Sequence, residues 1–501
     1  MTEINKINKL NELIATKSLY FPSAEIYSDN FGGFYEFGPI GNRIRLNLIN
    51  FWRKEFVRKN NFKEISGSLI LPKSVFVASG HLGGFNDPIA SCQKCHQKFK
   101  LDKYIAEKAN MDVPENLSDE EYKKLLIDNN ITCDTCGGQL TDLKRFNLMS
   151  SINVGTQEGN IGYLRGESCQ SIFLDFLRIY KSGRDNLPIG ISQHGLVYRN
   201  EIAPRNGLLR GREFEQLESE LFFNPNTIND YDVDQFNNYK IRFKLLKDNL
   251  EKDYSVEQIT KENITCGKLI TYYLVKTQKF LEKLGFNHSK LRYKEVIDTD
   301  KAFYSKQTFD LEIYCDNDWV ELFSLNYRTD YDLKSHSKGS KKDIVVKEDG
   351  VIIHPHVLEV CSIGLGRLFY LLLESSFEIK KVNEEERKIL HLNSKIAPYF
   401  VGILPLVKKD GLLEIAKEIG TKLDCDVFEF YFDEKGSIGK RYSRLDEIGV
   451  PYCITIDYQT KEDKTLTIRE RDTFEQKRIS IDKLEDILNK LYFEKISFKD
   501  I

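Results

Sequence analysis

The sequence lacks an apolar run long enough to cross a membrane. Its longest runs, such as VGILPLV at 401–407, fall far short of the roughly 18 residues that a span needs. The opening segment, MTEINKINKLNELIATKS, is polar and has no apolar stretch of the kind found in a secretory signal. Both absences lead us to expect a cytoplasmic protein that does not contact a membrane.

The sequence also lacks an excess of either charge. Its 73 basic and 76 acidic residues give a net charge of −3, which excludes a uniformly basic coat for nucleic acid but allows a local basic face. No repeat or low-complexity tract is visible, and 41% of the residues are hydrophobic, too many for a disordered chain. At roughly 150 residues per domain, 501 residues predict about three domains.

Four of the ten cysteines form two pairs with C-x-x-C spacing. They are Cys92 and Cys95 in SCQKCH, and Cys133 and Cys136 in TCDTCGG. This spacing lets both thiolates of a pair reach one tetrahedral ion at about 2.3 Å, and two pairs together are more specific for zinc than one. We therefore predict a structural zinc site within an insertion at 88–148. Four reduced cysteines without metal, or a redox pair, are the alternatives.

Hydrophobic periodicity organises the rest of the chain. Alternating apolar residues predict strands, and apolar runs after glycine turns predict buried helices. The expected elements are a helix within 37–57, strands at 189–203, 213–223 and 319–325, and helices at 364–374 and 410–423. Residues 224–295 are polar and favour a helical insertion. The charged stretch KKVNEEERK at 380–388 predicts a linker to a separate α/β domain that begins near residue 395.

The most informative segment is VYRNEIAPRN at 197–206, followed by GLLRGREFEQLESE at 207–220. It predicts two strands joined by an arginine-rich loop. The planar fork of Arg199 suits a carboxylate or a phosphate. Phe214 offers a flat face for a purine, and Glu201 offers an acceptor for an exocyclic amine. Mixed charges on one hairpin suit a mixed substrate, such as ATP with an amino acid, although a solvated charged hairpin is the better explanation of this segment if it is taken alone.

Three further segments add charged residues at the ends of elements. GYLRGESCQSIFLDF carries Arg165 and Glu167 ahead of an apolar helix, and WVELFSLNYRTDYDL ends a strand at Arg328. GLGRLFYLLLE places Arg367 at a glycine-rich helix start. A lone GxGR is weak evidence for a functional site, since most such turns only begin a helix, but four such elements in this order are strong evidence for one.

In this order the motifs resemble those of glycyl-tRNA synthetases of the class II, homodimeric type, over nearly the whole chain. GPIG and its helix resemble motif 1, the dimer element; YRNEIAPRN with RGREFEQLE resembles motif 2; GLGR resembles motif 3. The tail segments 436–457 and 464–488 resemble the anticodon-binding domain of several class II synthetases. Within them, Lys440, Arg441 and Arg444 are candidates for contacts to anticodon bases.

The resemblance implies an α+β fold. Its parts are a six-stranded antiparallel sheet flanked by helices, a four-cysteine zinc insertion and a C-terminal α/β anticodon-binding domain. The expected boundaries are 1–87 for the first part of the catalytic domain with motif 1, 88–148 for the zinc insertion, 149–394 for the rest of the catalytic domain with a helical insertion at about 224–295, and 395–501 for the anticodon-binding domain.

The resemblance also implies the reaction of a glycine–tRNA ligase. Glycine and ATP would give glycyl-adenylate and pyrophosphate, and the glycyl group would then pass to the 3′ end of tRNA(Gly). Mg²⁺ would accompany ATP with help from Glu321, since this ion prefers oxygen ligands. Zn²⁺ would be structural, and the protein would be a homodimer.

The match to motifs 2 and 3 implies the ATP site. Arg199 would bridge the glycine carboxylate and the α-phosphate, Glu201 would meet the adenine amine, and Phe214 would stack on adenine. The loop arginines would reach the β- and γ-phosphates, and Arg367 would hold the γ-phosphate; Arg199 and Arg367 are the implied catalytic residues. The implied ATP-binding residues are Arg199, Asn200, Glu201, Leu209, Arg210, Gly211, Arg212, Glu213, Phe214, Glu321, Leu322, Gly364, Leu365, Gly366 and Arg367.

Glycine has to be selected by exclusion, because it has no side chain to bind. By the resemblance, Glu167 and Glu218 would hold its ammonium group, Ser362 would close the pocket, and Glu359 would add a further carboxylate. These carboxylates could instead be salt-bridge partners of nearby arginines. The implied glycine-binding residues are Lys100, Glu167, Phe214, Glu215, Gln216, Glu218, Glu359 and Ser362.

The sequence departs from the family pattern around this pocket. Gly166 replaces a proline, Ser324 a glycine and Lys100 an arginine. The family's Glu-Pro-Ser before motif 3 is EVCS at 359–362, one residue longer, and its Glu-Leu-x-Gly-Ile-Ala strand is ELFSLN at 321–326.

Two other functions remain open. One is a class II synthetase for another small amino acid, such as threonine or proline, which the pair Glu167 and Glu218 disfavours. The other is a catalytically inactive, synthetase-like accessory protein that binds nucleic acid. Such a protein would lose its ATP arginines, whereas Arg199, Arg210 and Arg367 are all present here.

Overall fold

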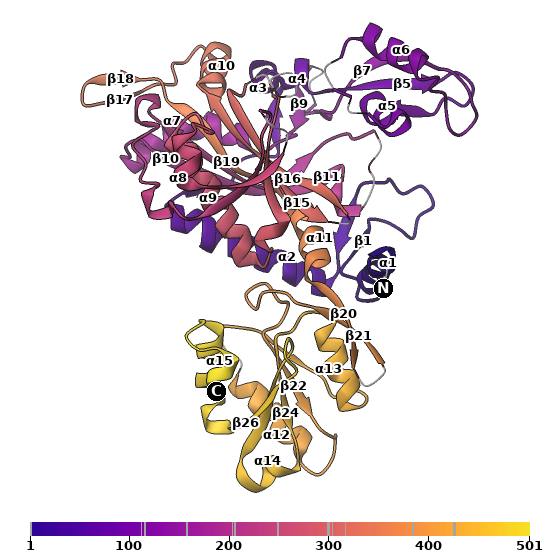
Figure 1. The fold of residues 1–501 in the computed structure, drawn as a ribbon, viewed down its shortest axis with the longest axis vertical. Helices are drawn as coiled ribbons and strands as arrows, with labels where there is room; N and C mark the ends of the chain where they lie inside the picture. The colour runs from indigo at the N-terminus through magenta and orange to yellow at the C-terminus, as the bar shows by residue number, and fades with distance from the viewer. Residues whose placement is uncertain are drawn as a thin grey trace.

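A large β-sheet organises the first three quarters of the chain (Figure 1). In the part of the chain that the computed structural model describes, its order is β13-β12-β14-β15-β16-β19-β11-β10-β3. The six strands from β14 to β10 pair antiparallel, whereas β12 joins β14 and β3 joins β10 in parallel. The expected six-stranded antiparallel sheet is therefore present and is extended at both edges. The strands are β3 (Lys63–Ile65), β10 (Ile189–Tyr198), β11 (Glu213–Phe223), β12 (Lys240–Lys244), β13 (Glu251–Ser255), β14 (Leu291–Glu295), β15 (Gln307–Cys315), β16 (Asp318–Thr329) and β19 (His356–Gly364).

The structure describes residues 3–111, 113–114, 117–156, 159–202, 204, 207–247, 250–297, 301–302, 304–315, 317–382, 385–423 and 427–501. Three positions of the expected arginine-rich loop, at 203, 205 and 206, lie outside these ranges.

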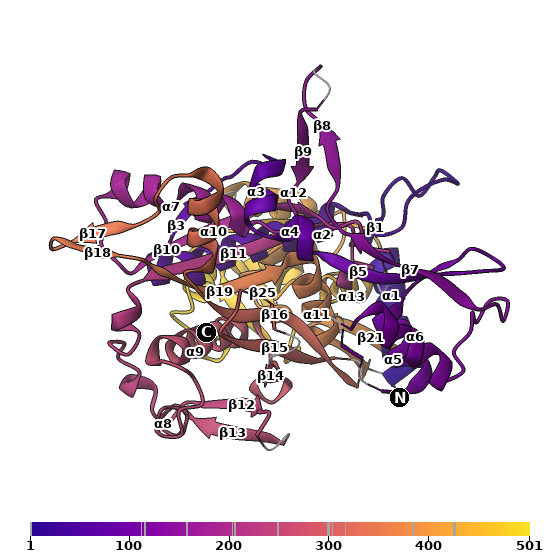
Figure 2. The same cartoon turned by 90° about the horizontal axis from the view of Figure 1, so that it is seen from above.

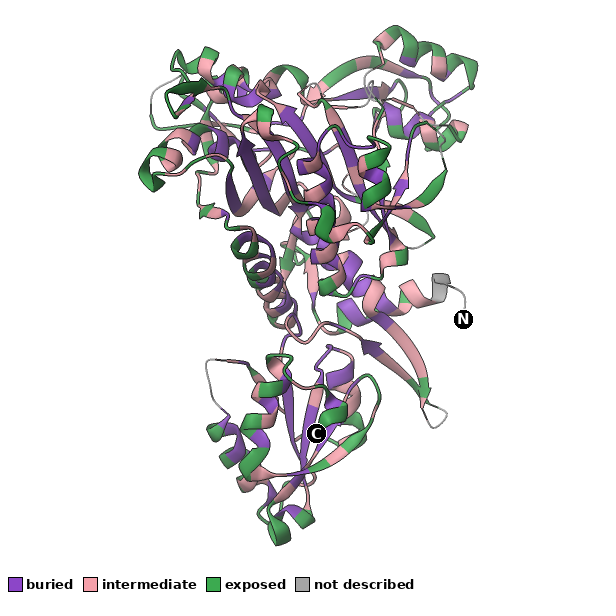
Figure 3. Ribbon diagram, turned by 60° about the vertical axis from the view of Figure 1, so that its left-hand side comes forward, coloured by how far each residue is buried: buried purple, intermediate pink, exposed green. Residues whose placement is uncertain are grey.

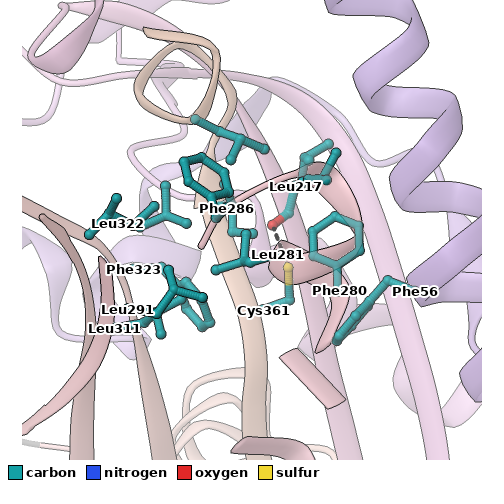
Figure 4. Close-up of a cluster of buried hydrophobic side chains, with 14 of the residues drawn as sticks. Phe56, Leu217, Phe280, Leu281, Phe286, Leu291, Leu311, Leu322, Phe323 and Cys361 are labelled. Carbon is teal, nitrogen blue, oxygen red and sulfur yellow. Dashed lines mark hydrogen bonds between the residues drawn. The ribbon is translucent and has the colours of Figure 1, made fainter. Parts of the chain in front are cut away.

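Helices cover both faces of the sheet because side chains alternate along each strand. On β11, Leu217 and Leu221 join the main core with α2 (Pro39–Trp52), α9 (Lys268–Leu284) and α11 (Leu365–Ser376). Figure 4 shows part of this core, where Leu217 lies near Phe280 and Leu281 of α9. Phe222 faces the other way and packs in a second core with α7 (Cys169–Gly183) and α10 (Tyr331–Ser340). The sheet is therefore largely buried (Figure 3).

Residues 224–295 differ from the expected helical insertion. They form α8 (Val256–Lys261) and α9, but also β12, β13 and β14, which extend the large sheet. The buried residues Ile241 and Phe243 of β12 are two positions apart, which is the period of a strand. The high charge of this segment concealed that short pattern.

The region of the C-x-x-C pairs folds around a small core of its own, at the upper right of Figure 1. Its strands pair in the order β6-β5-β7, and Phe99, Tyr104 and Tyr122 are buried between them and two helices. The elements are β5 (Asn86–Cys92), β6 (Lys98–Lys100), β7 (Leu140–Asn147), α5 (Leu101–Ala109) and α6 (Asp119–Asp128). Lys100 is the last residue of β6.

The C-terminal region is a five-stranded sheet with helices, as an α/β domain requires (Figure 1, yellow). The order is β23-β22-β24-β25-β26, with parallel pairing on both sides of β22. Its elements are β22 (Val401–Pro405), α12 (Leu412–Lys422), β23 (Phe430–Phe432), α13 (Ile438–Asp446), β24 (Tyr452–Ile456), α14 (Tyr458–Asp463), β25 (Thr465–Glu470), β26 (Gln476–Ser480) and α15 (Leu484–Tyr492).

The charged stretch before this domain is not a plain linker. It forms an antiparallel hairpin of β20 (Phe377–Val382) and β21 (Glu385–Leu390). Lys388 of β21 pairs with Glu12 of α1 (Glu3–Thr16) at 2.7 Å, and Lys9 pairs with Glu386. These ion pairs, together with apolar residues of both segments in the main core, join the stretch to the N-terminal helix.

Two small hairpins project from the body in Figure 2: β8 with β9, and β17 with β18. No helix among the described residues is long and apolar enough to span a membrane. The remaining elements are β1 (Tyr20–Pro22), β2 (Tyr35–Phe37), β4 (Ile70–Pro72), α3 (Lys73–Ala78), α4 (His81–Gly84), β8 (Ser151–Asn153), β9 (Ile161–Leu164), β17 (Val346–Glu348) and β18 (Val351–Ile353).

Candidate active site

A cavity of about 500 Å³ lies over the large sheet, between the motif 2 hairpin and the four-cysteine region. Most of the residues expected at the ATP and glycine sites line it. These are Lys100, Glu167, Arg199, Glu201, Leu209, Arg210, Gly211, Phe214, Gln216, Glu321, Leu322, Glu359, Ser362, Gly364, Gly366 and Arg367. Ser324, which the sequence marked as a departure from the family pattern, also lines it, and residues that the sequence did not single out complete the lining, among them Phe85, Asp87, Lys103, Tyr304 and Asn326.

Six expected residues do not line the cavity: Asn200, Arg212, Glu213, Glu215, Glu218 and Leu365. Strand alternation explains Glu215, which lies on the face of β11 opposite Phe214 and Gln216. Its carboxylate accepts hydrogen bonds from Arg45 of α2 and from His194, at 2.8 Å. Arg212 donates to the backbone oxygens of Glu201, at 2.9 Å, and of Gly32, at 3.0 Å. Both side chains therefore hold the framework of the site together.

Arg199 is fixed at the cavity wall. Its Nε donates to the backbone oxygen of Gly166 at 3.0 Å, and its Nη2 lies 3.5 Å from Glu167 Oε1. The guanidinium carbon also lies 5.2 Å from the ring centroid of Phe85 and 5.5 Å from that of Phe214. Two aromatic faces and one carbonyl thus orient a cation that borders the cavity.

Two more arginines line the cavity, each beside a carboxylate. Arg210 binds Glu201 through two nitrogens, at 2.8 and 2.6 Å. Arg367, on the first turn of α11, donates to the backbone oxygen of Glu321 at 2.6 Å and lies 3.4 Å from its Oε1. A phosphate could replace either carboxylate as the arginine's partner, because both anions match the guanidinium fork.

The far end of the cavity is acidic and buried. Glu218 lies beneath the lining and accepts from Ser362, at 3.2 Å, while Glu359 accepts from Arg328, at 2.8 Å. Arg328 is itself buried, with two further bonds to Asp332 at 2.7 and 2.8 Å. Carboxylates therefore outnumber cations at this end, which suits an ammonium group.

The pKa values follow from this crowding. Burial would raise the pKa of Glu167, but His81, Arg199 and Arg328 overcome that effect and hold the pKa well below its usual range. Burial raises the pKa of Glu218 well above its usual value, and the charges of Glu359 and Glu167 add to the rise. A bound cation would relieve this repulsion.

The residue added before motif 3 is absorbed by a β-bulge in β19. Ser219 of β11 pairs with Cys361, whereas the next residue, Glu220, pairs with Glu359, so Val360 is the extra residue. In a regular strand, residues three apart face opposite sides. The bulge lets Glu359 and Ser362 line the same cavity.

The four cysteines predicted to bind zinc come together. Their sulfur atoms all lie within 4.8 Å of one another, with Cys92 and Cys136 3.4 Å apart and Cys95 and Cys133 3.6 Å apart. A tetrahedral ion with bonds of about 2.3 Å would separate its sulfur ligands by about 3.8 Å. The thiols of this cluster therefore fit a zinc ion.

Of the three residues considered for anticodon contacts, only Arg441 is buried. Arg441 is 2% exposed and donates to the backbone oxygens of Gly436 and Pro405. Arg444 binds Asp433 at 3.0 and 2.5 Å. Lys440, by contrast, is exposed.

Sequence patterns gave no signal for several lining residues. Phe85 directly follows α4, and Lys103 lies on α5 of the four-cysteine region; both reach the cavity only through tertiary packing. Ser324 and Asn326 had a usable signal. They are two apart on a strand, so they share the face that carries the cavity.

Comparisons with known proteins agree with this geometry. Residues 154–376 match the family described as the tRNA synthetase class II core domain (G, H, P, S and T), and residues 401–491 match the anticodon binding domain. Glycine–tRNA ligase from Thermococcus gammatolerans is 36% identical, covering 98% of this chain and 99% of the relative. Those from Pyrococcus abyssi and Methanocaldococcus jannaschii are 37% and 34% identical, covering 97% and 96% of this chain and 98% of each relative.

A crystal structure described as the RNA binding domain of threonyl-tRNA synthetase from Cryptosporidium parvum Iowa II is similar in fold. Its TM-score is 0.59 at 17% identity, over 96% of this chain and 97% of that one. Together with the six antiparallel strands and the arginine-lined cavity, the core match defines a class II aminoacyl-tRNA synthetase. The full-length relatives narrow the class: the chain belongs to the glycine–tRNA ligase family.

Proposed function

We propose that this chain activates glycine with ATP and transfers the glycyl group to the 3′ end of tRNA(Gly). One observation carries the proposal. A single cavity joins arginines suited to phosphates, at one end, to a buried acidic end suited to an ammonium group. The full-length similarity to glycine–tRNA ligases supports it.

In the first step, the glycine carboxylate attacks the α-phosphate and pyrophosphate leaves. This chemistry needs no strong base, so positioning and charge neutralisation supply most of the acceleration. Arg199 would hold the carboxylate and α-phosphate together, and Phe214 would stack on adenine. Arg210 and Arg367 would exchange their carboxylate partners for the outer phosphates.

In the second step, a terminal hydroxyl of the tRNA attacks the carbonyl carbon of the adenylate and AMP leaves. Glu167, Glu218 and Glu359 would keep the ammonium group in place during both steps. Because they lie close around it, a larger amino acid would meet their side chains, which favours glycine over threonine or proline. The presence of Arg199, Arg210 and Arg367 in the cavity disfavours an inactive accessory protein.

Two metals belong to the proposal. Mg²⁺ would neutralise the phosphates, with Glu321 as the cavity carboxylate placed to hold it. Zn²⁺ would be held by Cys92, Cys95, Cys133 and Cys136, and would keep the 88–148 region, and with it Lys100, in place. Metal analysis should find about one zinc per chain; a zinc-free protein whose four thiols all titrate would contradict this assignment.

The assembly and location are likewise proposed. Residues 1–87 and 149–394 would form the catalytic domain, 88–148 the zinc insertion and 395–501 the anticodon-binding domain. The protein would act as a homodimer through motif 1, in the cytoplasm, where thiols stay reduced. Sedimentation should report a dimer, and a fully active monomer would contradict the role of motif 1.

The test of function is ATP–pyrophosphate exchange without tRNA, measured with glycine, alanine, serine, threonine and proline. Exchange that requires glycine is expected. Exchange that requires another of these amino acids would support the ATP site but assign the enzyme a different amino-acid substrate. Exchange with none of them would favour the inactive accessory protein.

A further inference from the structure

Asn326 of β16 lies directly across from Glu359 of β19 at the acidic end of the cavity. The two residues are cross-strand partners, and both line the cavity. Asn326 Nδ2 donates to Glu359 Oε2 at 3.2 Å, and Arg328 Nη1 donates to the same oxygen at 2.8 Å. No described residue donates a hydrogen bond to Glu359 Oε1. The carboxylate is thus held by one oxygen, and the other is left for a ligand.

The Asn326 amide also has a hydrogen-bond partner on the side away from Glu359. Thr308 Oγ1 donates to Asn326 Oδ1 at 2.7 Å, and Ser305 Oγ lies 2.8 Å from Thr308 Oγ1. Because an ionised carboxylate can only accept, the amide nitrogen faces Glu359, and the amide oxygen is left to accept from Thr308. Asn326 is only 4% exposed and Thr308 is also 4% exposed, so water offers little competition for these bonds.

The bulge at Val360 makes this support necessary. It turns Glu359 toward the cavity by interrupting the register with β11, so the position of the carboxylate depends more on contacts from β16. In the family pattern the strand before motif 3 is one residue shorter, and alanine stands where this chain has Asn326. The extra residue of β19 and the asparagine of β16 therefore affect the same cross-strand pair, Asn326 and Glu359.

We propose that Asn326 is a positioning residue for Glu359, and that it thereby sets how tightly the cavity holds the ammonium group of glycine. The inference rests on the proposed glycine activation. The amide is a neutral donor, so it orients the carboxylate that Arg328 already pairs with and adds no further positive charge beside the ammonium group of the substrate.

The experiment is glycine-dependent ATP–pyrophosphate exchange by full-length wild type, Asn326→Ala, Thr308→Val, Glu359→Gln and the double variant Asn326→Ala with Glu359→Gln. Asn326→Ala should raise KM for glycine about tenfold, the loss of one hydrogen bond to a charged group, with KM for ATP unchanged within about twofold. Thr308→Val, which is nearly isosteric and outside the cavity lining, should shift KM for glycine in the same direction by about two- to threefold. In the Glu359→Gln background, Asn326→Ala should raise KM for glycine little further, since the carboxylate that Asn326 positions is already absent.

An Asn326→Ala enzyme with unchanged KM for glycine would overturn the inference, and so would a KM for ATP that rises as much as the KM for glycine. A double variant whose KM for glycine is a further tenfold above that of Glu359→Gln would also overturn it. If Asn326→Ala does not fold, as judged by thermal melting, Thr308→Val decides alone, and an unchanged KM for glycine then overturns the inference. Wild type with no glycine-dependent exchange would instead overturn the proposed function, together with this inference.

Discussion

The catalytic cavity and the C-terminal domain both contain arginines, but they use them differently. In the cavity, the side chains of Arg199, Arg210 and Arg367 are 27%, 33% and 32% exposed, and each lies beside one carboxylate. In the C-terminal domain, Arg441 is 2% exposed and bonds to backbone carbonyls, and Arg469 is also 2% exposed and binds Asp446 at 2.9 and 3.0 Å. The three cavity arginines can therefore exchange a carboxylate for a ligand, whereas the two buried arginines of the C-terminal domain cannot.

The difference comes from where each arginine stands. Arg199 follows the end of β10, Arg210 follows the short 3-10 helix Gly207–Leu209 in the loop before β11, and Arg367 lies on the first turn of α11, after a glycine. Arg441 lies on the inner side of α13, where its donors satisfy carbonyls at the end of β22. Removing a buried donor leaves those carbonyls unpaired, while an exposed arginine can exchange a carboxylate for a phosphate. Residue type alone does not separate the two uses.

The largest effect is expected for Arg199→Ala. It removes the cation that would bridge carboxylate and α-phosphate, so kcat for ATP–pyrophosphate exchange should fall by about 10²- to 10³-fold, as for loss of other preorganised donors. Arg178→Ala is the matched control, because the Arg178 side chain is 85% exposed on α7, away from the cavity lining. It should exchange at the wild-type rate. Exchange near that rate by the Arg199 variant, in folded protein, would remove Arg199 from its assigned role.

Arg441→Ala should act on stability and not on chemistry. Its loss leaves the carbonyls of Gly436 and Pro405 without their donor, at a cost of about 3 kcal/mol to the C-terminal fold. Hydrogen exchange by mass spectrometry should report faster exchange in β22 and α13, while glycine-dependent exchange without tRNA stays close to wild type. Lys440→Ala, at the exposed neighbour, should leave the protection of both elements unchanged. Equal protection in the two variants would show that Arg441 is not structural.

The contrast between these regions shows what the sequence could and could not predict. The C-x-x-C spacing predicted the four-cysteine cluster, and the residues of the motif 2 hairpin predicted part of the cavity lining, because both patterns lie within short stretches of sequence. Strand alternation was also available: Phe214 and Glu215 are adjacent, so a regular strand cannot direct both into one cavity. The bulge at Val360 could not be predicted, since it arises from how β19 pairs with a strand more than a hundred residues away in sequence.

Glu215→Gln tests whether Glu215 faces away from the cavity, as strand alternation requires. Glu215 was expected to bind glycine but is bound by Arg45 and His194 on the other face of β11. The substitution should weaken the attachment of α2 and lower the free energy of unfolding by about 1–2 kcal/mol. KM for glycine should remain within about twofold of wild type, against the tenfold rise expected for Asn326→Ala. A selective rise in KM for glycine, without loss of thermal stability, would return Glu215 to the glycine site.

The smallest effect is expected for Asp310→Asn, beside the cavity. Burial, and then the charge of Glu321, raises the pKa of Asp310 to about 7, while Ser324 donates to its carboxyl at 2.5 Å. A carboxyl whose pKa rises on folding stabilises the fold fully below its unfolded pKa, near 3.8, and this contribution is lost as pH rises through about 7. Asparagine has no charge to bury, so the variant's Tm relative to wild type should increase between pH 6 and pH 7, by about 2–4 °C for roughly 1 kcal/mol. Melting curves that shift in parallel for both proteins over this range would show that Asp310 does not titrate there.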